Sequence, residues 1–165
     1  MMFRNRICQR LHDEHAATVT SMERLESLIA RHRGAPPTGA DADSMLLRGI
    51  ADNVELEVSP HFDFEEQHLF TYLEDMGDAA IGAHLASEHE SMRPLGRRLA
   101  ELARSAAQSG FDDASWSEFR RIGAELSERM LTHVQKEEMA LLPLLDEAMD
   151  PATETRLFEA YTENS

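Results

Sequence analysis

The sequence is poor in cysteine, proline, glycine and aromatic residues, and it has no long hydrophobic run. Cys8 is the only cysteine in 165 residues, which excludes an intrachain disulfide and any metal site built on several thiolates. No apolar stretch approaches the roughly 20 residues of a membrane-spanning helix, so we expect no membrane partner. Charged residues at the start are followed by no apolar segment before Asp13, so we expect no secretory signal and a cytoplasmic protein.

Positive charge is also scarce. The chain has 16 Lys and Arg against 31 Asp and Glu, a formal net charge of −15. Binding to phosphate backbones needs a basic stripe, and none is visible, so we expect no nucleic-acid partner. Ala, Leu, Glu and Arg are abundant instead, which favours helices over strands. With 42% hydrophobic residues, the sequence predicts one all-α domain over residues 1–165.

Apolar residues recur at steps of three and four over four long segments, the pattern of amphipathic helices. We therefore predict an up-down-up-down four-helix bundle. A short C-terminal fifth helix should begin at Pro151 after an Asp150 cap. The predicted helices cover residues 5–33, 44–75, 78–108, 114–149 and 151–161. Pro60 falls inside the second, where we expect a kink or a restart capped by Ser59.

One pattern occurs twice. The segment HFDFEE at 61–66 recurs as HVQKEE at 133–138, and each copy follows a Glu-His pair, at 14–15 and 88–89. The two His-x-x-x-Glu segments lie 72 positions apart and the two Glu-His pairs 74 apart. On a helix, a Glu four residues after a His lies one turn along on the same side. Two such pairs and two more histidines, all facing inward, predict a cage for two metal ions.

The prediction of a metal site depends mainly on the carboxylates, because a single histidine on an apolar stripe is more often a core residue. Glu65 and Glu137 lie on apolar stripes without Lys or Arg at neighbouring turns, where an uncompensated charge would cost several kcal/mol. Imidazole and carboxylate without thiolate suit iron or manganese better than a structural zinc. Ferritin-like bundles place a Glu three before the His, and neither His15 nor His89 has one.

These motifs, in this order over almost the whole chain, resemble the hemerythrin-like, or HHE cation-binding, domain family. The resemblance implies two iron ions joined by an oxo or hydroxo bridge. It also implies four terminal iron ligands, which are His15, His61, His89 and His133. Glu65 and Glu137 would bridge the two irons. Each iron would then keep one open position.

Two alternatives stay open at this site. Oxygen-carrying hemerythrins have a fifth histidine at a spacing of four from the third-helix ligand, which His89 lacks. His84, five positions before His89, would lie about 140° round the helix and can be a metal ligand only where the helix bulges. Glu138 offers a bridge at a spacing of five in place of Glu137. Two further histidines are either outer partners of the ligands or helix-edge residues: His12 and His68.

Three functions are compatible with the sequence. The first is a di-iron protein that reversibly binds or senses dioxygen or nitric oxide. The second is enzyme-like, the decomposition of peroxide or the supply of iron for repair of iron–sulfur centres, both known among relatives with four histidines and two glutamates. The third is a bundle without metal, against which the buried carboxylates argue.

Overall fold

The structure is a computed structural model that describes residues 2–39 and 43–163. Within these residues it is helical and contains no strand, so the prediction of an all-α chain is confirmed for them. The first and third segments are α1 (Arg6–Arg31) and α5 (Ala80–Ser109). The second runs through α2 (Ser44–Leu56), η2 (Glu57–His61), α3 (Phe62–Phe64), η3 (Glu65–Leu69) and α4 (Phe70–Asp75). The fourth comprises α6 (Asp113–Lys136), η4 (Glu137–Leu141) and α7 (Leu142–Ala148), before α8 (Pro151–Glu163).

Side-chain caps explain where several helices begin. The Asp43 carboxylate accepts the backbone N–H of Met45 at 2.9 Å, which satisfies a free donor at the start of α2. Asp150 accepts the backbone N–H of Thr153 at 2.7 Å, just before α8 begins at Pro151. The starts of these two helices therefore agree with the sequence prediction.

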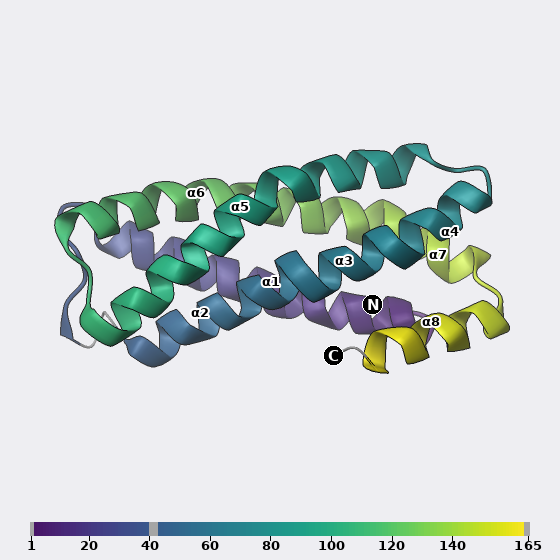
Figure 1. Ribbon diagram of the computed structural model, residues 1–165, viewed down its shortest axis with the longest axis horizontal. Coiled ribbons are helices and arrows are strands. Elements are labelled where there is room, and N and C mark those ends of the chain that lie inside the picture. Colours follow the sequence, from purple (N-terminus) through teal and green to yellow (C-terminus); the bar gives the residue numbers. More distant parts are fainter. Residues whose placement is uncertain (1, 40–42, 164–165) are drawn as a thin grey trace.

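Successive long segments run in alternate directions along the long axis, and α8 turns back beside α1 (Figure 1). Their apolar faces form two separate buried clusters. Along α1, for example, one cluster ends at Leu11 and the other begins at Met22. Along α5, the change falls between Leu85 and Met92. The predicted ligand residues lie where one cluster gives way to the other, so they form a polar layer inside the bundle.

Three π-helical turns distinguish this bundle from four plain α-helices. The second segment does not restart at Ser59, because η2 widens into a π turn that carries the helix through Pro60. The Val58 carbonyl beside it accepts a hydrogen bond from Arg93 Nη1 at 2.6 Å. The other two turns, η3 and η4, begin at Glu65 and Glu137 in equivalent places of the two halves. Such turns change the direction of side chains and recur at functional sites.

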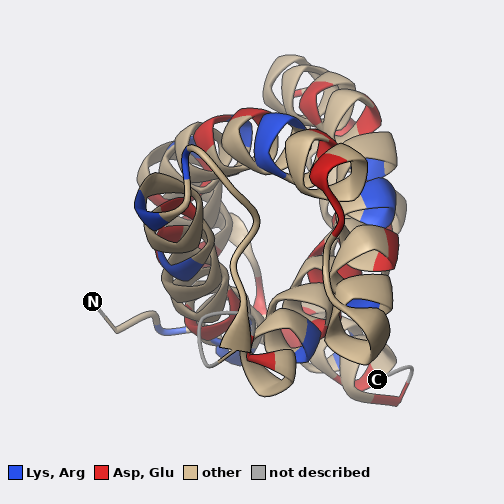
Figure 2. Cartoon of the chain, turned by 90° about the vertical axis from the view of Figure 1, so that its left-hand side faces the viewer, with Lys and Arg blue, Asp and Glu red and all other residues tan. Residues whose placement is uncertain are grey.

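Seen end-on, the helices form a ring whose acidic and basic residues are interspersed (Figure 2). Among the described residues, no helix combines the length and apolar content needed to cross a bilayer. Close packing between α5 and the neighbouring second segment depends on Gly96, where a Cβ would lie 2.8 Å from Val58 Cγ1. A side chain there would push α5 away from the second segment.

Candidate metal centre

Six of the seven predicted site residues meet in the polar layer. They are His15 on α1, His61 on η2, Glu65 on η3, His89 on α5, His133 on α6 and Glu137 on η4. None is more than 1% exposed. All four long segments of the bundle therefore contribute to one buried cluster.

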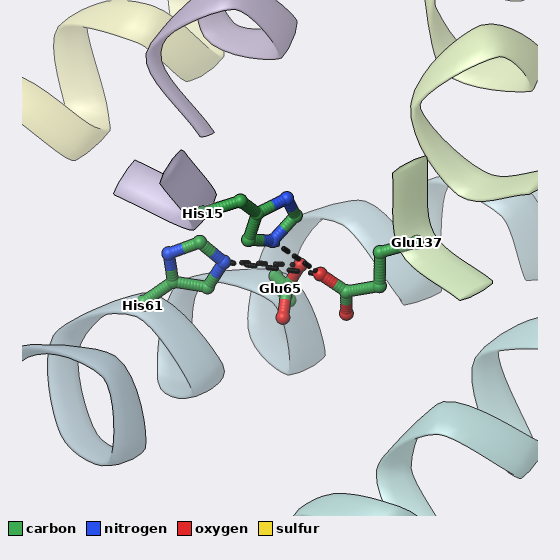
Figure 3. Close-up of side chains that lie close together, drawn as sticks. All are labelled: His15, His61, Glu65 and Glu137. Carbon is green, nitrogen blue, oxygen red and sulfur yellow. Dashed lines mark hydrogen bonds and ion pairs between the residues drawn. The ribbon is translucent and has the colours of Figure 1, made fainter. Parts of the chain in front are cut away.

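The cluster divides into two overlapping groups that could each hold a metal ion. The first group consists of His15, His61, Glu65 and Glu137, and the second of His89, His133, Glu65 and Glu137. Within each group, one potential ligand atom per residue lies within 4.8 Å of the others. Figure 3 shows the first group, in which both imidazole rings turn a nitrogen toward the carboxylates.

The two glutamates connect the groups. Glu65 presents Oε2 to His61 Nε2 at 3.4 Å and Oε1 to His89 Nε2 at 3.3 Å. Glu137 presents Oε1 to His15 Nε2 at 2.8 Å and Oε2 to His133 Nε2 at 3.0 Å. Each carboxylate thus offers one oxygen to each group, which is the arrangement of a bridging ligand.

Several atoms of the cluster lack the partners that a buried polar atom normally has. Both oxygens of Glu65, Glu137 Oε2 and His61 Nε2 are buried without a hydrogen bond in the described part of the chain. His89 Nε2 and His133 Nε2 face each other at 3.1 Å. Oxygen and nitrogen atoms that can bind a metal thus converge on a dry interior, where unpaired polar groups are costly. The residues present therefore fit metal ions.

A second layer of carboxylates holds the outer nitrogen of every histidine. The Nδ1 atoms contact Glu138 (2.8 Å from His15), Glu14 (2.9 Å from His61), Glu66 (2.6 Å from His89) and Glu88 (2.8 Å from His133). We call these four glutamates the outer acids. Because a carboxylate only accepts, each Nδ1–H donates to its outer acid, and each Nε2 is the ring nitrogen that can bind an ion once its proton is displaced. This explains why each half repeats a Glu-His pair and a doubled glutamate.

The outer acids have partners of their own nearer the surface. These are Arg10 and Tyr161 on Glu14, Arg93 on Glu66, Lys136 on Glu88, and His12 on Glu138. His12 is therefore an outer partner at this site. His68 packs against the Phe64 ring, with centroids 5.0 Å apart, and does not belong to the cluster.

Sequence reasoning missed Glu57, which is 2% exposed and lies beside the first group. Its Oε2 accepts the Thr18 hydroxyl at 3.1 Å and lies 3.3 Å from His61 Nδ1. Its Oε1 is buried and has no hydrogen-bond partner among the residues that the structure describes, and burial raises the pKa of this carboxyl. The spacing of four residues before His61 was the signal that could have revealed it.

The charges in the cluster are strongly interdependent. Burial lowers the pKa of His15, but hydrogen bonds to Glu137 and Glu138 outweigh it and raise the pKa to about 10. Burial likewise lowers the pKa of His89, and the nearby carboxylates of Glu137 and Glu65 raise it to about 10. Burial raises the pKa of Glu137, but the neighbouring His133 and further histidines hold it well below its ordinary value. Metal binding must therefore displace protons from the imidazoles.

The structure does not place His84 in the cluster. Its side chain is 59% exposed, and its Nε2 accepts a hydrogen bond from Lys136 Nζ at 3.1 Å. The bulge that would have turned it inward is missing, since α5 is an unbroken α-helix. Glu138 contacts His15 Nδ1 from outside and belongs to neither group, whereas Glu137 belongs to both.

Residues 6–145 match the family model of the hemerythrin HHE cation binding domain. The chain belongs to this family. A search of curated proteins finds no match. The part of this hemerythrin-like domain that matches contains the six cluster residues and the four outer acids, whereas Tyr161 lies beyond it.

Proposed function

We propose that the first and second groups each hold one iron ion, within an up-down-up-down bundle, and that the protein reversibly binds or senses dioxygen or nitric oxide. The observation that carries this proposal is the placement of Glu65 and Glu137, each with one oxygen in both groups. A single ion would need only one such group. Two adjacent ions use every atom of the cluster that lacks a partner.

The donor set favours iron. His15 and His61 would hold one ion, and the histidines of the second group the other. Imidazole nitrogen and carboxylate oxygen without sulfur suit iron or manganese. Cys8 does not contribute, because it is buried in an apolar cluster and its thiol contacts the Leu142 carbonyl. Iron bound here would supply a redox-active centre with positions left for a small ligand.

The surroundings favour a ligand that is small and uncharged. The six cluster residues are at most 1% exposed, so a large or charged substrate has no direct access to them. The Phe62 ring stacks on His89 with centroids 3.7 Å apart and covers the second group with an apolar wall. A diatomic molecule can enter such an interior, from which water and bulky reductants are kept away.

The test begins with anaerobic loading of the full chain with ferrous iron and a count of bound metal. We expect about two irons per chain and a visible spectrum that changes with oxygen or nitric oxide and returns when the gas is removed. A preference for one zinc ion, or no binding, would contradict the di-iron site. A loaded protein that rapidly releases gas from peroxide would favour the enzyme-like alternative.

A matched pair of variants identifies where the gas binds. Glu65→Ala removes an oxygen from each group and should abolish the spectral change. Glu74→Ala, at an exposed position of the same helical segment, should leave it intact. A spectrum that survives Glu65→Ala would mean that the gas binds elsewhere.

A further inference from the structure

The two halves of the metal centre are related by the sequence repeat, and three of the features that break this relation add polar groups beside the first group. The shift of 72 that relates His61 to His133 takes the buried Glu57 to Arg129. The shift of 74 that relates His15 to His89 takes Thr18 to Met92. The third is Tyr161, which donates to Glu14 from α8, beyond the repeated segments. These three polar groups have no counterpart beside the second group.

The outer acids are equal in number beside the two groups, with two on each side. Arg10 binds Glu14 on the first side, and Lys136 binds Glu88 on the second. Arg93 binds Glu66 on the second side, where His12 binds Glu138 on the first. Beyond these outer contacts, one buried acidic residue lies beside the first group.

Glu57 is that residue. It is 2% exposed, its described contacts are to Thr18 and His61, and its Oε1 has no hydrogen-bond partner. At the equivalent place beside the second group, Arg129 has a side chain that is 50% exposed and bonds Glu125. His61 Nδ1 therefore faces two carboxylates, Glu14 and Glu57, and His133 Nδ1 faces Glu88.

We infer that Glu57 makes the two groups unequal, so that the first group binds a divalent cation before the second group and more tightly. The inference rests on the proposed two-metal site. A second carboxylate on His61 makes this imidazole a stronger donor. The extra buried carboxylate also lies where solvent screens its attraction for a cation only weakly. Glu57 acts through His61 and is a positioning residue.

The test is a titration of the metal-free full chain with cobalt(II), followed by histidine ¹⁵N resonances that are assigned to each ring. We expect the first equivalent to shift His15 and His61, and the second equivalent to shift His89 and His133. Glu57→Gln keeps the shape and the Thr18 contact but not the carboxylate. It should weaken the first step about ten- to a hundredfold and remove the order of filling.

The control is Arg129→Gln, at the position that the repeat relates to Glu57. It should change the cobalt affinity of both binding steps by no more than about twofold, as expected for an exposed charge. Simultaneous filling of both groups in the unaltered chain, or an unchanged first step in Glu57→Gln, would overturn the inference. If Glu57→Gln does not fold, the order of filling in the unaltered chain carries the test: filling of the first group before the second supports the inference, and simultaneous or reverse filling overturns it. Binding of fewer than two cobalt ions to the unaltered chain would instead contradict the proposed two-metal site.

Discussion

The first group and the second group have the same inner construction and different surroundings. In both, two imidazoles turn Nε2 toward Glu65 and Glu137 and hold Nδ1 on an outer acid. Beside the first group lie the buried Glu57 and the Tyr161 hydroxyl. Beside the second lies the Phe62 ring, stacked on His89. The repeat thus sets the geometry of the ligands, while unrepeated neighbours set the charge around each group.

The largest expected effect comes from breaking what the groups share. Glu137→Ala removes an oxygen from each group, so we expect binding to fall from two ions to at most one. The same loss is expected for Glu65→Ala. Metal content of the purified variants measures it, with the exposed Glu74→Ala as control. Retention of two ions in either variant would show that the carboxylate does not bridge.

A pH titration tests whether the buried histidines of the two groups have similar pKa values. His15 and His89, one from each half, both have a pKa raised from 6.5 to about 10. A raised pKa stabilises the fold fully below pH 6.5, and this contribution is lost as pH rises through about 10. The metal-free chain should therefore become less stable over this pH window. Its melting temperature should fall by about 2–4 °C for each kcal/mol lost from the free energy of unfolding.

Metal loading should remove this loss, because a bound ion replaces the proton on each Nε2. Thermal melts of both forms between neutral and alkaline pH provide the measurement. NMR of the metal-free chain adds a direct comparison, since the two imidazoles should titrate together. Titration of one of them near its ordinary pKa would show that the inner layers of the groups differ.

The outer acids should separate the two groups from each other. Glu14→Gln weakens the partner of His61, and Glu88→Gln weakens the partner of His133. Each variant should lower the affinity for one ion about ten- to a hundredfold and spare the other group. Cobalt(II) titrations with assigned histidine resonances would measure this. An equal effect on both groups would mean that the outer acids act on the whole cluster.

The smallest expected effect is at His84. This side chain is 59% exposed and contacts Lys136 and Glu88 outside the cluster. We expect His84→Ala to bind the same number of ions with an unchanged visible spectrum. A lost ion or a shifted spectrum would show that this histidine moves inward when metal binds.

Much of the fold could be predicted because the signals for its helices lie within short stretches of the sequence. Apolar residues at steps of three and four indicate the helices, and Asp43 and Asp150 cap helices close to the predicted starts. The path through Pro60 was not predictable in this way. The Val58 carbonyl beside this proline bonds Arg93, which lies on another helix and has no local signature.

The cluster was predictable to the extent that it repeats. Two copies of His-x-x-x-Glu and two Glu-His pairs predict that six residues lie together, and the structure brings the same six together. Glu57 and Tyr161 have no counterpart in the second half, so the repeat could not reveal them. The sequence alone does not decide whether His84 is a metal ligand, because a helix bulge could turn it inward, and α5 has no such bulge.

The most direct test of the central claim is anomalous diffraction at the iron edge from crystals of the iron-loaded chain. We expect two peaks, one beside His15 and His61 and one beside His89 and His133, with Glu65 and Glu137 contacting both. A single peak in the cluster, or peaks outside it, would contradict the shared two-metal centre.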